Sequence, residues 1–138
     1  MFEKMLVALD DSERREETLL KATDLAKVLG GEVEVLHVRE GHFIGRAGAV
    51  PDEDAGESES IVDDAVKALN DAGVHATGKV RGALHGRVAR EILDEAEESG
   101  ASLIVMGSRG ATDLEGVLLG STTHKVLHLG TLPVFVVR

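Results

Sequence analysis

The chain has 138 residues, of which 43% are hydrophobic and only 2% are aromatic. This length and composition predict one globular domain, residues 1–138, with a core of aliphatic side chains. The scarcity of aromatic residues excludes a base-stacking platform for single-stranded nucleic acid, and the formal net charge of −10 disfavours nucleic acid as a partner. The absence of cysteine excludes disulfides, thiolate metal sites and cysteine nucleophiles.

The hydrophobic residues are spread over many short runs, none of which reaches the length that crossing a bilayer requires. The first residues favour a strand and not a signal sequence. We therefore expect a cytoplasmic protein with no membrane partner.

Hydrophobic periodicity predicts strands that alternate with helices. The strands are short apolar runs, and the helices carry apolar residues three or four positions apart. In chain order, the expected elements are a strand over 4–9, a helix over 12–29, a strand over 32–38, a helix over 60–72, a strand over 74–80, a helix over 88–99, a strand over 103–106, a helix over 120–129 and a strand over 133–137. Gly30, Gly73 and Gly100 end the first three helices.

The segment 39–60 shows no sustained period. It contains glycines, Pro51 and several acids, so we expect a long loop there. Ser60 and Asp63 have the spacing of a helix cap followed by an acid in the first turn, which predicts that the second helix begins at Ser60.

The predicted order is βαβαβαβαβ, and the strands are almost continuously apolar. This pattern indicates an α/β fold, with an open parallel sheet covered by helices on both faces. Ligands of such sheets bind at the carboxyl ends of the strands, where the winding direction reverses.

The most informative motif follows the fourth strand. It is Gly107-Ser-Arg-Gly110, nine residues, and then Gly120-Ser121 at the start of the last helix. Glycines allow a positive φ and a close approach of the backbone to a ligand. A helix start offers unpaired N–H groups and a favourable dipole, so Ser121 and Thr123 fit a phosphate cradle. Two interpretations of Arg109 stay open: its side chain contacts a phosphate, or it is a solvent-exposed arginine of the loop.

Asp10 follows the first strand and faces the glycine motif if the first and fourth strands are neighbours. It accepts hydrogen bonds from ribose hydroxyls, or it caps the first helix, since Asp10 and Glu13 have capping-box spacing. The glycine motif on the other side favours the ligand role. Val38, at the end of the second strand, lies at the same edge of the sheet.

Other catalytic and metal-binding patterns are missing or ambiguous. The sequence has no Gly-Lys-Ser/Thr phosphate loop and no G-x-G-x-x-G after the first strand, and we find no nucleophile–base pair. His124 and His128 are four residues apart on one helix face, which permits a metal site, although a polar stripe is the favoured interpretation. We expect His37 at the edge of the core. The remaining histidines are predicted at the surface: His42, His75 and His85.

Four segments match a known family. They are the opening strand and turn at 5–13, Leu36-His37-Val38, the motif G-x2-G-x9-G-[ST] at 104–126, and the last strand at 133–137. Through these segments the chain resembles the universal stress protein family along nearly its whole length. The glycine motif marks the members that bind ATP.

This resemblance implies a Rossmann-like sheet of five parallel strands in the order 3-2-1-4-5, with ATP, ADP or AMP bound at the crevice. Asp10 and the Val38 backbone would hold the adenosine end, Ala8 would line the pocket, and Met106 and Gly107 would flank the ribose. The implied phosphate ligands are Arg109, Gly110, Gly120, Ser121, Thr122 and Thr123. Mg²⁺ or Mn²⁺ would be held through the phosphates.

The resemblance also implies a homodimer formed through the last strand. Physical reasoning agrees, because a terminal strand as apolar as Val134–Val137 is an aggregation-prone edge if it is left uncovered. Pairing with the same strand of a second copy, related by twofold symmetry, removes that edge. Cover by a loop or helix is the alternative.

Three functions fit the sequence. The first is a dimeric, ATP-binding regulatory module of the stress response. The second is a slow ATPase or phosphotransfer enzyme that uses the same pocket, which the lack of a recognisable base disfavours. The third is a flavodoxin-like protein that binds FMN, which the lack of aromatic residues to sandwich the flavin ring disfavours.

Overall fold

In the computed structural model, the described residues are 1–110, 116 and 118–138. They form one six-stranded sheet flanked by helices. The strands are β1 (Lys4–Ala8), β2 (Glu32–Phe43), β3 (Ala49–Pro51), β4 (Ala76–Leu84), β5 (Leu103–Gly107) and β6 (Val134–Val137). The helices are α1 (Arg15–Leu29), α2 (Ala55–Asp71), α3 (Val88–Ser99), α4 (Ser121–Leu129) and the short 3-10 turn η1 (Gly45–Ala47).

The five predicted strands lie in the predicted arrangement. Their order across the sheet is β4-β2-β1-β5-β6, and each pair of neighbours is parallel. The sheet departs from the expected one through a sixth strand, β3, which pairs antiparallel with the far end of β2. The fold class is therefore confirmed, and the sheet is larger and more mixed than we expected.

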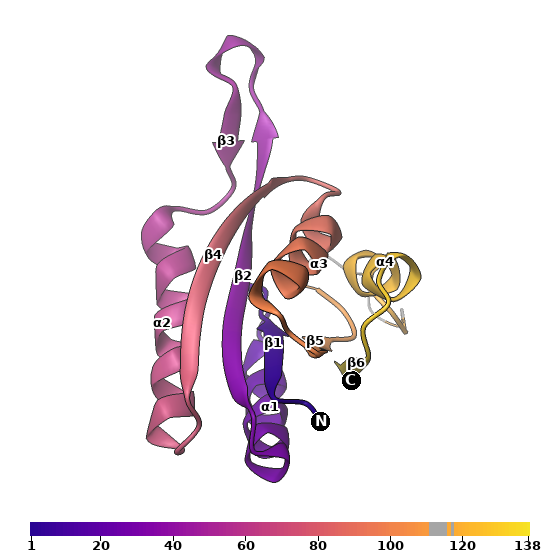
Figure 1. The fold of residues 1–138 in the computed structure, drawn as a ribbon. Coiled ribbons are helices and arrows are strands. Elements are labelled where there is room, and N and C mark those ends of the chain that lie inside the picture. The colour runs from indigo at the N-terminus through magenta and orange to yellow at the C-terminus, as the bar shows by residue number, and fades with distance from the viewer. Residues whose placement is uncertain (111–115, 117) are drawn as a thin grey trace.

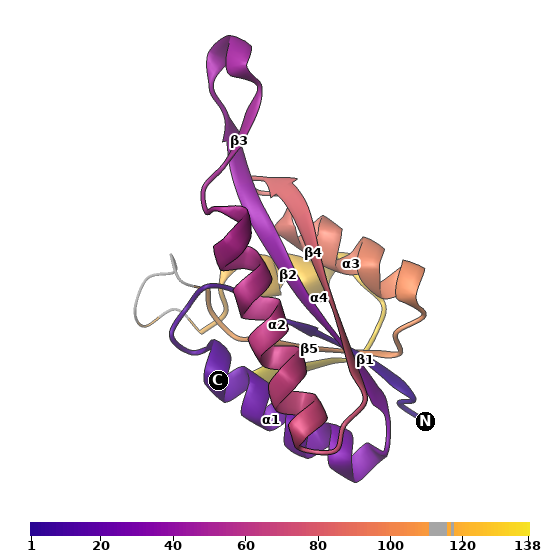
Figure 2. The same ribbon diagram turned by 90° about the vertical axis from the view of Figure 1, so that its left-hand side faces the viewer.

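Each face of the sheet carries its own aliphatic cluster. One contains Met5, Val7, Val35 and Val105 with the buried sides of α1 and α2. The other contains Leu6, Leu36 and Ile104 with α3 and α4. Figures 1 and 2 show these helix pairs on opposite sides of the sheet. Alternate residues of each strand thus fill opposite layers, as the period of a β-strand requires. Among the described helices, none is both long and apolar enough to cross a membrane.

The prediction of a loop over 39–60 is wrong. β2 continues to Phe43, η1 and β3 follow, and α2 begins at Ala55. The strand persists because β2 pairs with β4 through nine consecutive positions, from Val33↔Ala76 to Gly41↔Leu84. Such long-range pairing leaves no periodic trace in a local window of sequence. The resulting β2–β3 hairpin projects beyond the rest of the sheet (Figures 1 and 2).

The ends of three other elements also differ from the predicted ones. The cap of α2 is Asp54, whose side chain accepts a hydrogen bond from the Glu57 N–H at 2.8 Å, so the prediction of Ser60 is wrong. β4 covers 76–84 where we expected 74–80, and α1 begins at Arg15 where we expected residue 12. These shifts exceed the one or two residues by which fraying blurs a boundary, because strand pairing and the Asp54 cap, and not local periodicity, set the ends of β4 and α2.

Candidate functional site

A cavity of about 400 Å³ opens at the carboxyl ends of β1 and β5, beside the middle of β2, because β2 continues to Phe43 and Val38 is not the end of that strand as we expected. It is lined by all the sequence-predicted site residues except Gly120: Ala8, Asp10, Val38, Met106, Gly107, Arg109, Gly110, Ser121, Thr122 and Thr123. β1 pairs with both β2 and β5, so the strand ends meet at one edge of the sheet. The structure thus brings distant parts of the sequence together around one space.

The end of β1 positions Asp10. The Leu9 N–H still donates to the Leu36 carbonyl at 2.9 Å, and the chain then turns away from the sheet. Asp10 Oδ1 accepts the Ser12 N–H at 2.9 Å, which holds this turn. The N-cap position of α1 is Arg14, so Asp10 is not the cap of that helix. Its carboxylate instead lies on the wall of the cavity.

The backbone of Val38 faces the same space. The Leu36 carbonyl points toward β1, and groups two residues apart along a strand point the same way. The N–H and carbonyl of Val38 therefore point beyond the end of β1. The buried His37 lies between these two residues, and its Nδ1 donates to the Leu9 carbonyl at 2.7 Å. This contact confirms His37 as a residue of the core edge and fixes the place where β1 and β2 part.

Short contacts hold the two ends of the glycine motif together. The Ser108 N–H donates to the Val137 carbonyl at 2.7 Å, and the Gly120 N–H donates to the Ser108 carbonyl at 2.6 Å. The Thr123 hydroxyl donates to the Gly107 carbonyl at 2.8 Å. These bonds fasten the start of α4 to the end of β5. Most of the spacer between Gly110 and Gly120 lies outside the described residues.

The first turn of α4 presents backbone donors. The first bond of the helix runs from the His124 N–H to the Gly120 carbonyl, so the helix supplies no acceptor for the N–H groups of residues 121–123. Gly120 is the N-cap, with φ −70° and ψ 165° and no side-chain cap. Gly120 therefore does not use the positive φ that glycine allows. Because its hydroxyl serves Gly107, Thr123 offers a ligand its backbone N–H.

Positive side chains line the cavity together with several carboxylates, although the chain as a whole is strongly acidic. Four arginines line it: Arg14, Arg15, Arg109 and Arg138. Arg14 Nη2 also donates to the Gly110 carbonyl at 3.3 Å, which links α1 to the glycine motif. Sequence reasoning identified Arg109 alone, because the others come from α1 and the C-terminal end and reach the site through the fold. Helix donors and arginines together favour an anion.

The cavity lining also contains apolar residues, namely Leu36, Val88, Ile92 and Met106. Glu40, Asp52 and His85 are part of the same lining. Val88 and Ile92 come from α3, and sequence analysis counted them only as helix positions. The polar residues come from the β2–β3 hairpin and the end of β4, where we expected a loop and a turn. The cavity thus combines anion-binding groups at the glycine motif with apolar lining residues.

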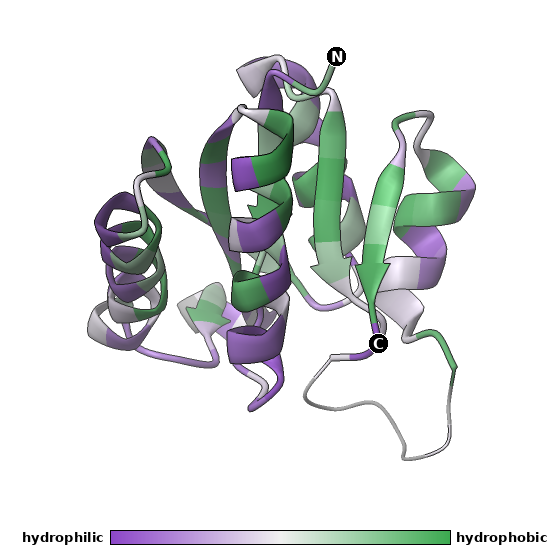
Figure 3. Cartoon of the chain, turned by 90° about the horizontal axis from the view of Figure 1, so that it is seen from below, coloured by the Kyte–Doolittle hydropathy of each residue, from purple (hydrophilic) through white to green (hydrophobic). Residues whose placement is uncertain are grey.

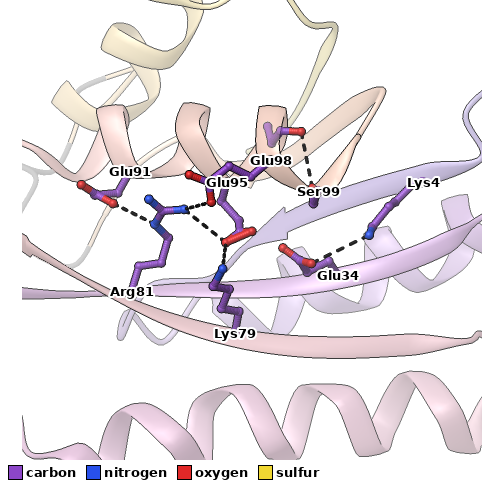
Figure 4. A network of polar contacts seen from close by, with 9 residues as sticks. Lys4, Glu34, Lys79, Arg81, Glu91, Glu95, Glu98 and Ser99 are labelled. Atoms are coloured by element: carbon purple, nitrogen blue, oxygen red, sulfur yellow. Dashed lines mark hydrogen bonds and ion pairs between the residues drawn. The ribbon is translucent and has the colours of Figure 1, made fainter.

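A separate network of ion pairs lies between α3 and the sheet (Figure 4). Glu95 is buried and pairs with Lys79 Nζ at 2.7 Å and Arg81 Nη1 at 3.3 Å. Burial and the neighbouring Glu95 raise the pKa of Glu34, which Lys4 approaches only to 3.9 Å. Burial opposes the charge on Glu95, but hydrogen bonds with Lys79, Glu34 and Arg81 hold its pKa below the usual value. These charges secure α3 and do not line the cavity.

The sequence profile of the universal stress protein family matches residues 1–138. The universal stress protein YxiE of Bacillus subtilis is 38% identical to this chain, and the match covers 100% of both sequences. The chain belongs to the universal stress protein family.

Solved structures of universal stress proteins share the fold. That of the protein MJ0577 of Methanocaldococcus jannaschii gives a TM-score of 0.80 at 27% identity, over 99% of this chain and 96% of that one. A universal stress protein from Archaeoglobus fulgidus, solved in complex with dAMP, gives a TM-score of 0.74 at 25% identity, over 99% of this chain and 98% of its own. Some members of the family therefore bind adenine nucleotides.

Proposed function

We propose that this universal stress protein binds ATP in the cavity and acts in the cytoplasm as a nucleotide-dependent regulatory module of the stress response. The observation that carries the proposal is the composition of the cavity lining. Backbone N–H groups of α4, Arg14 and Arg109 lie at the glycine motif, and the lining also includes Val38 and apolar side chains such as Val88 and Met106. The volume of about 400 Å³ is in the range of small-molecule sites. The dAMP complex of the Archaeoglobus relative supports the choice of an adenine nucleotide.

Different groups of the cavity lining suit different parts of the nucleotide. The N–H groups of residues 121–123 and Arg14 and Arg109 suit the phosphates, and ADP or AMP would use fewer of these donors. Asp10 suits the ribose hydroxyls as an acceptor. The Val38 N–H and carbonyl suit the polar edge of adenine, and the half-buried Val88 suits one of its faces. Mg²⁺ or Mn²⁺ would be held through the phosphates, and the nearby carboxylates of Asp10 and Asp11 are compatible with such oxygen-liganded cations.

We also propose a homodimer through β6. β6 pairs with β5 on one side only among the described strands, and it carries Phe135 with 42% of its surface exposed. Leu127 and Leu129 of the neighbouring α4 are exposed as well. Figure 3 shows the apolar colour of β6 at this edge of the sheet, leading to the C-terminus. A second copy would pair this edge and cover these side chains.

The purified protein distinguishes the candidate functions. Release of ATP or ADP on denaturation, identified by mass spectrometry, is expected and supports nucleotide binding. Turnover of added ATP with Mg²⁺ would favour the slow ATPase over the regulatory module. A yellow flavin chromophore would contradict both.

A further inference from the structure

A second cluster of ligand-type side chains lies at the base of the projecting hairpin. Asp52 Oδ1 lies 2.6 Å from His42 Nδ1, and Asp52 Oδ2 lies 2.5 Å from His85 Nε2. The two imidazole centroids are 6.1 Å apart. One ligand atom from each of the three residues lies within 4.8 Å of the others, the only such group among the described residues. Three segments that are distant in the sequence therefore converge on one point.

Backbone hydrogen bonds fix the three segments beside one another. The Asp52 N–H donates to the Glu40 carbonyl at 2.8 Å, and the His85 N–H donates to the Gly41 carbonyl at 3.0 Å. Gly41 lies in register with both Pro51 and Leu84. A Cβ at Gly41 would lie 2.7 Å from the Val50 carbonyl oxygen, so this close approach of β3 depends on glycine. The cluster thus rests on paired strands and not on a free loop.

The donor set has the composition of a transition-metal site. Two imidazole nitrogens and one carboxylate are common protein ligands of Zn²⁺, which leaves a fourth position for water or a substrate group. Glu40 Oε1 lies 3.6 Å from His85 Nδ1, the ring nitrogen on the other side from Asp52. A carboxylate behind a histidine ligand orients the ring and raises its basicity.

The surroundings also suit a cation. The side chains of His42, Asp52 and His85 are 48%, 36% and 55% exposed, so they are open to an ion from solvent. Tetrahedral zinc, with bonds of about 2.0–2.1 Å, needs ligand atoms about 3.3 Å apart. Small rotations of these exposed side chains provide that spacing. The net charge of −10 favours the approach of a cation.

We propose that His42, Asp52 and His85 form a binding site for a divalent transition-metal ion of the zinc class. The site is distinct from a metal ion carried by nucleotide phosphates, because its ligands lie on the hairpin and after β4. Asp52, His85 and Glu40 also belong to the cavity lining, so the open coordination position lies at the cavity rim. The pair His124 and His128, with ring centroids 6.2 Å apart, has no such third ligand among the described residues.

The test is a metal titration of the full chain after a chelator has removed bound metal and after unfolding, dialysis and refolding have removed any co-purified nucleotide. Zn²⁺ is added in a calorimeter, and Co²⁺ is added while its visible absorption bands are recorded. The wild-type protein is expected to bind one equivalent at the cluster. His42→Ala, His85→Ala and Asp52→Asn should each weaken Zn²⁺ binding by at least about tenfold. Because no nucleotide is present, the result does not depend on the proposed function of the cavity.

Matched variants give the controls. His75→Ala removes an exposed histidine that approaches a single carboxylate, Glu32, at 3.9 Å, and it should leave zinc affinity unchanged. The double variant His124→Ala, His128→Ala should also bind as the wild type does. Circular dichroism confirms that each variant is folded. If the wild type binds neither ion, the three side chains only hydrogen-bond to one another, and the proposal is overturned. Unchanged affinity in folded His42→Ala, His85→Ala and Asp52→Asn overturns it as well.

Discussion

Arg14 shows how a single side chain joins two parts of the cavity. It occupies the N-cap position of α1, and its guanidinium donates to the Gly110 carbonyl on the opposite wall. A guanidinium in this position can bind a phosphate and order the glycine motif at the same time. Nothing in the local sequence around Arg14 indicates this role, because the residue reaches the site only when β1 and β5 pair.

The first prediction concerns Arg14. Arg14→Ala should weaken ATP binding on the order of tenfold, about 1.4 kcal/mol, because one charge-assisted contact to the phosphates is lost. Adenosine, which has no phosphate, should bind the variant and the wild type equally. Calorimetric titration with both ligands measures the difference. Arg90→Ala, at an exposed position of α3, is the control. Equal losses for ATP and adenosine would show that Arg14 acts on the fold of the pocket and not on the phosphates.

The second prediction concerns the buried carboxyl of Glu34. Its raised pKa means that the folded protein keeps a proton that the unfolded chain releases above pH 4.5. The contribution of this group to stability is therefore present below that pH and is lost as the pH rises through the raised pKa. Glu34→Gln keeps a donor toward Glu95 without a charge. The free energy of unfolding of the variant relative to wild type should therefore rise with pH.

Urea unfolding across the acid to neutral range measures this trend. Glu32→Gln, on the same strand but exposed, should show no such trend and is the control. If the free energies of unfolding of Glu34→Gln and wild type differ by the same amount at every pH, the raised pKa of Glu34 in the folded protein is contradicted.

At the scale of elements, the start of α2 depends on residues that the sequence pattern did not single out. The Asp54 side chain accepts the Glu57 N–H, and the Ser58 hydroxyl donates to Glu53 Oε1 at 2.7 Å. Glu53 in turn hydrogen-bonds His37 Nε2 on β2. The beginning of α2 is thus fixed to the sheet by a chain of polar contacts.

The third prediction separates the observed cap from the expected one. Asp54→Ala should lower the free energy of unfolding by about 1 kcal/mol, because an N–H of the first turn loses its acceptor. Ser60→Ala should leave the free energy of unfolding unchanged or raise it slightly, because Ser60 lies inside the helix, where alanine is favoured. Chemical denaturation measures both. The reverse order of the two effects would restore Ser60 as the functional cap.

The helices and parallel strands could be predicted because their signals are local. For example, the apolar spacing along 12–29 and the glycine after it predict the end of α1 at Leu29 and place its start three residues too early. The hairpin over 40–52 could not be predicted, because its strands are stabilised by β4 and by the close approach at Gly41. The site follows the same division. Gly107, Arg109 and Ser121 lie in one recognisable motif. Arg14, Asp52 and His85 reach the cavity only because strand pairing brings their segments to it.

At the scale of the whole molecule, the two edges of the parallel strands differ. At one edge, β4 carries exposed polar residues such as Thr77 and Lys79, and α2 packs on the face that β2 and β4 form. β6 at the other edge is short and apolar, and Phe135 remains exposed. An uncovered apolar edge of this kind favours association of two chains.

The fourth prediction tests the proposed dimer. Val136→Asp places a charge on β6 and should convert a dimer into a monomer, because the carboxylate would be buried without a partner at the interface. Light scattering measures the molecular mass of the wild type and of each variant in solution. Val28→Asp, on α1 at 82% exposure, should remain dimeric and is the control. An unchanged mass for Val136→Asp would place the interface elsewhere or exclude a dimer.

The fifth prediction tests the central claim, that an adenine nucleotide binds with its phosphates at the start of α4. The measurement is calorimetric titration of ATP into wild type, Gly120→Val and Ser121→Ala, with Ser102→Ala at the opposite end of β5 as the control. We predict that wild type and Ser102→Ala bind ATP equally, and that both cradle variants lose at least about tenfold in affinity. Valine at the buried position 120 would displace the α4 donors, and Ser121→Ala would remove a hydroxyl that donates to a phosphate. Absence of ATP binding by the wild type, or full affinity in both cradle variants, would contradict the account.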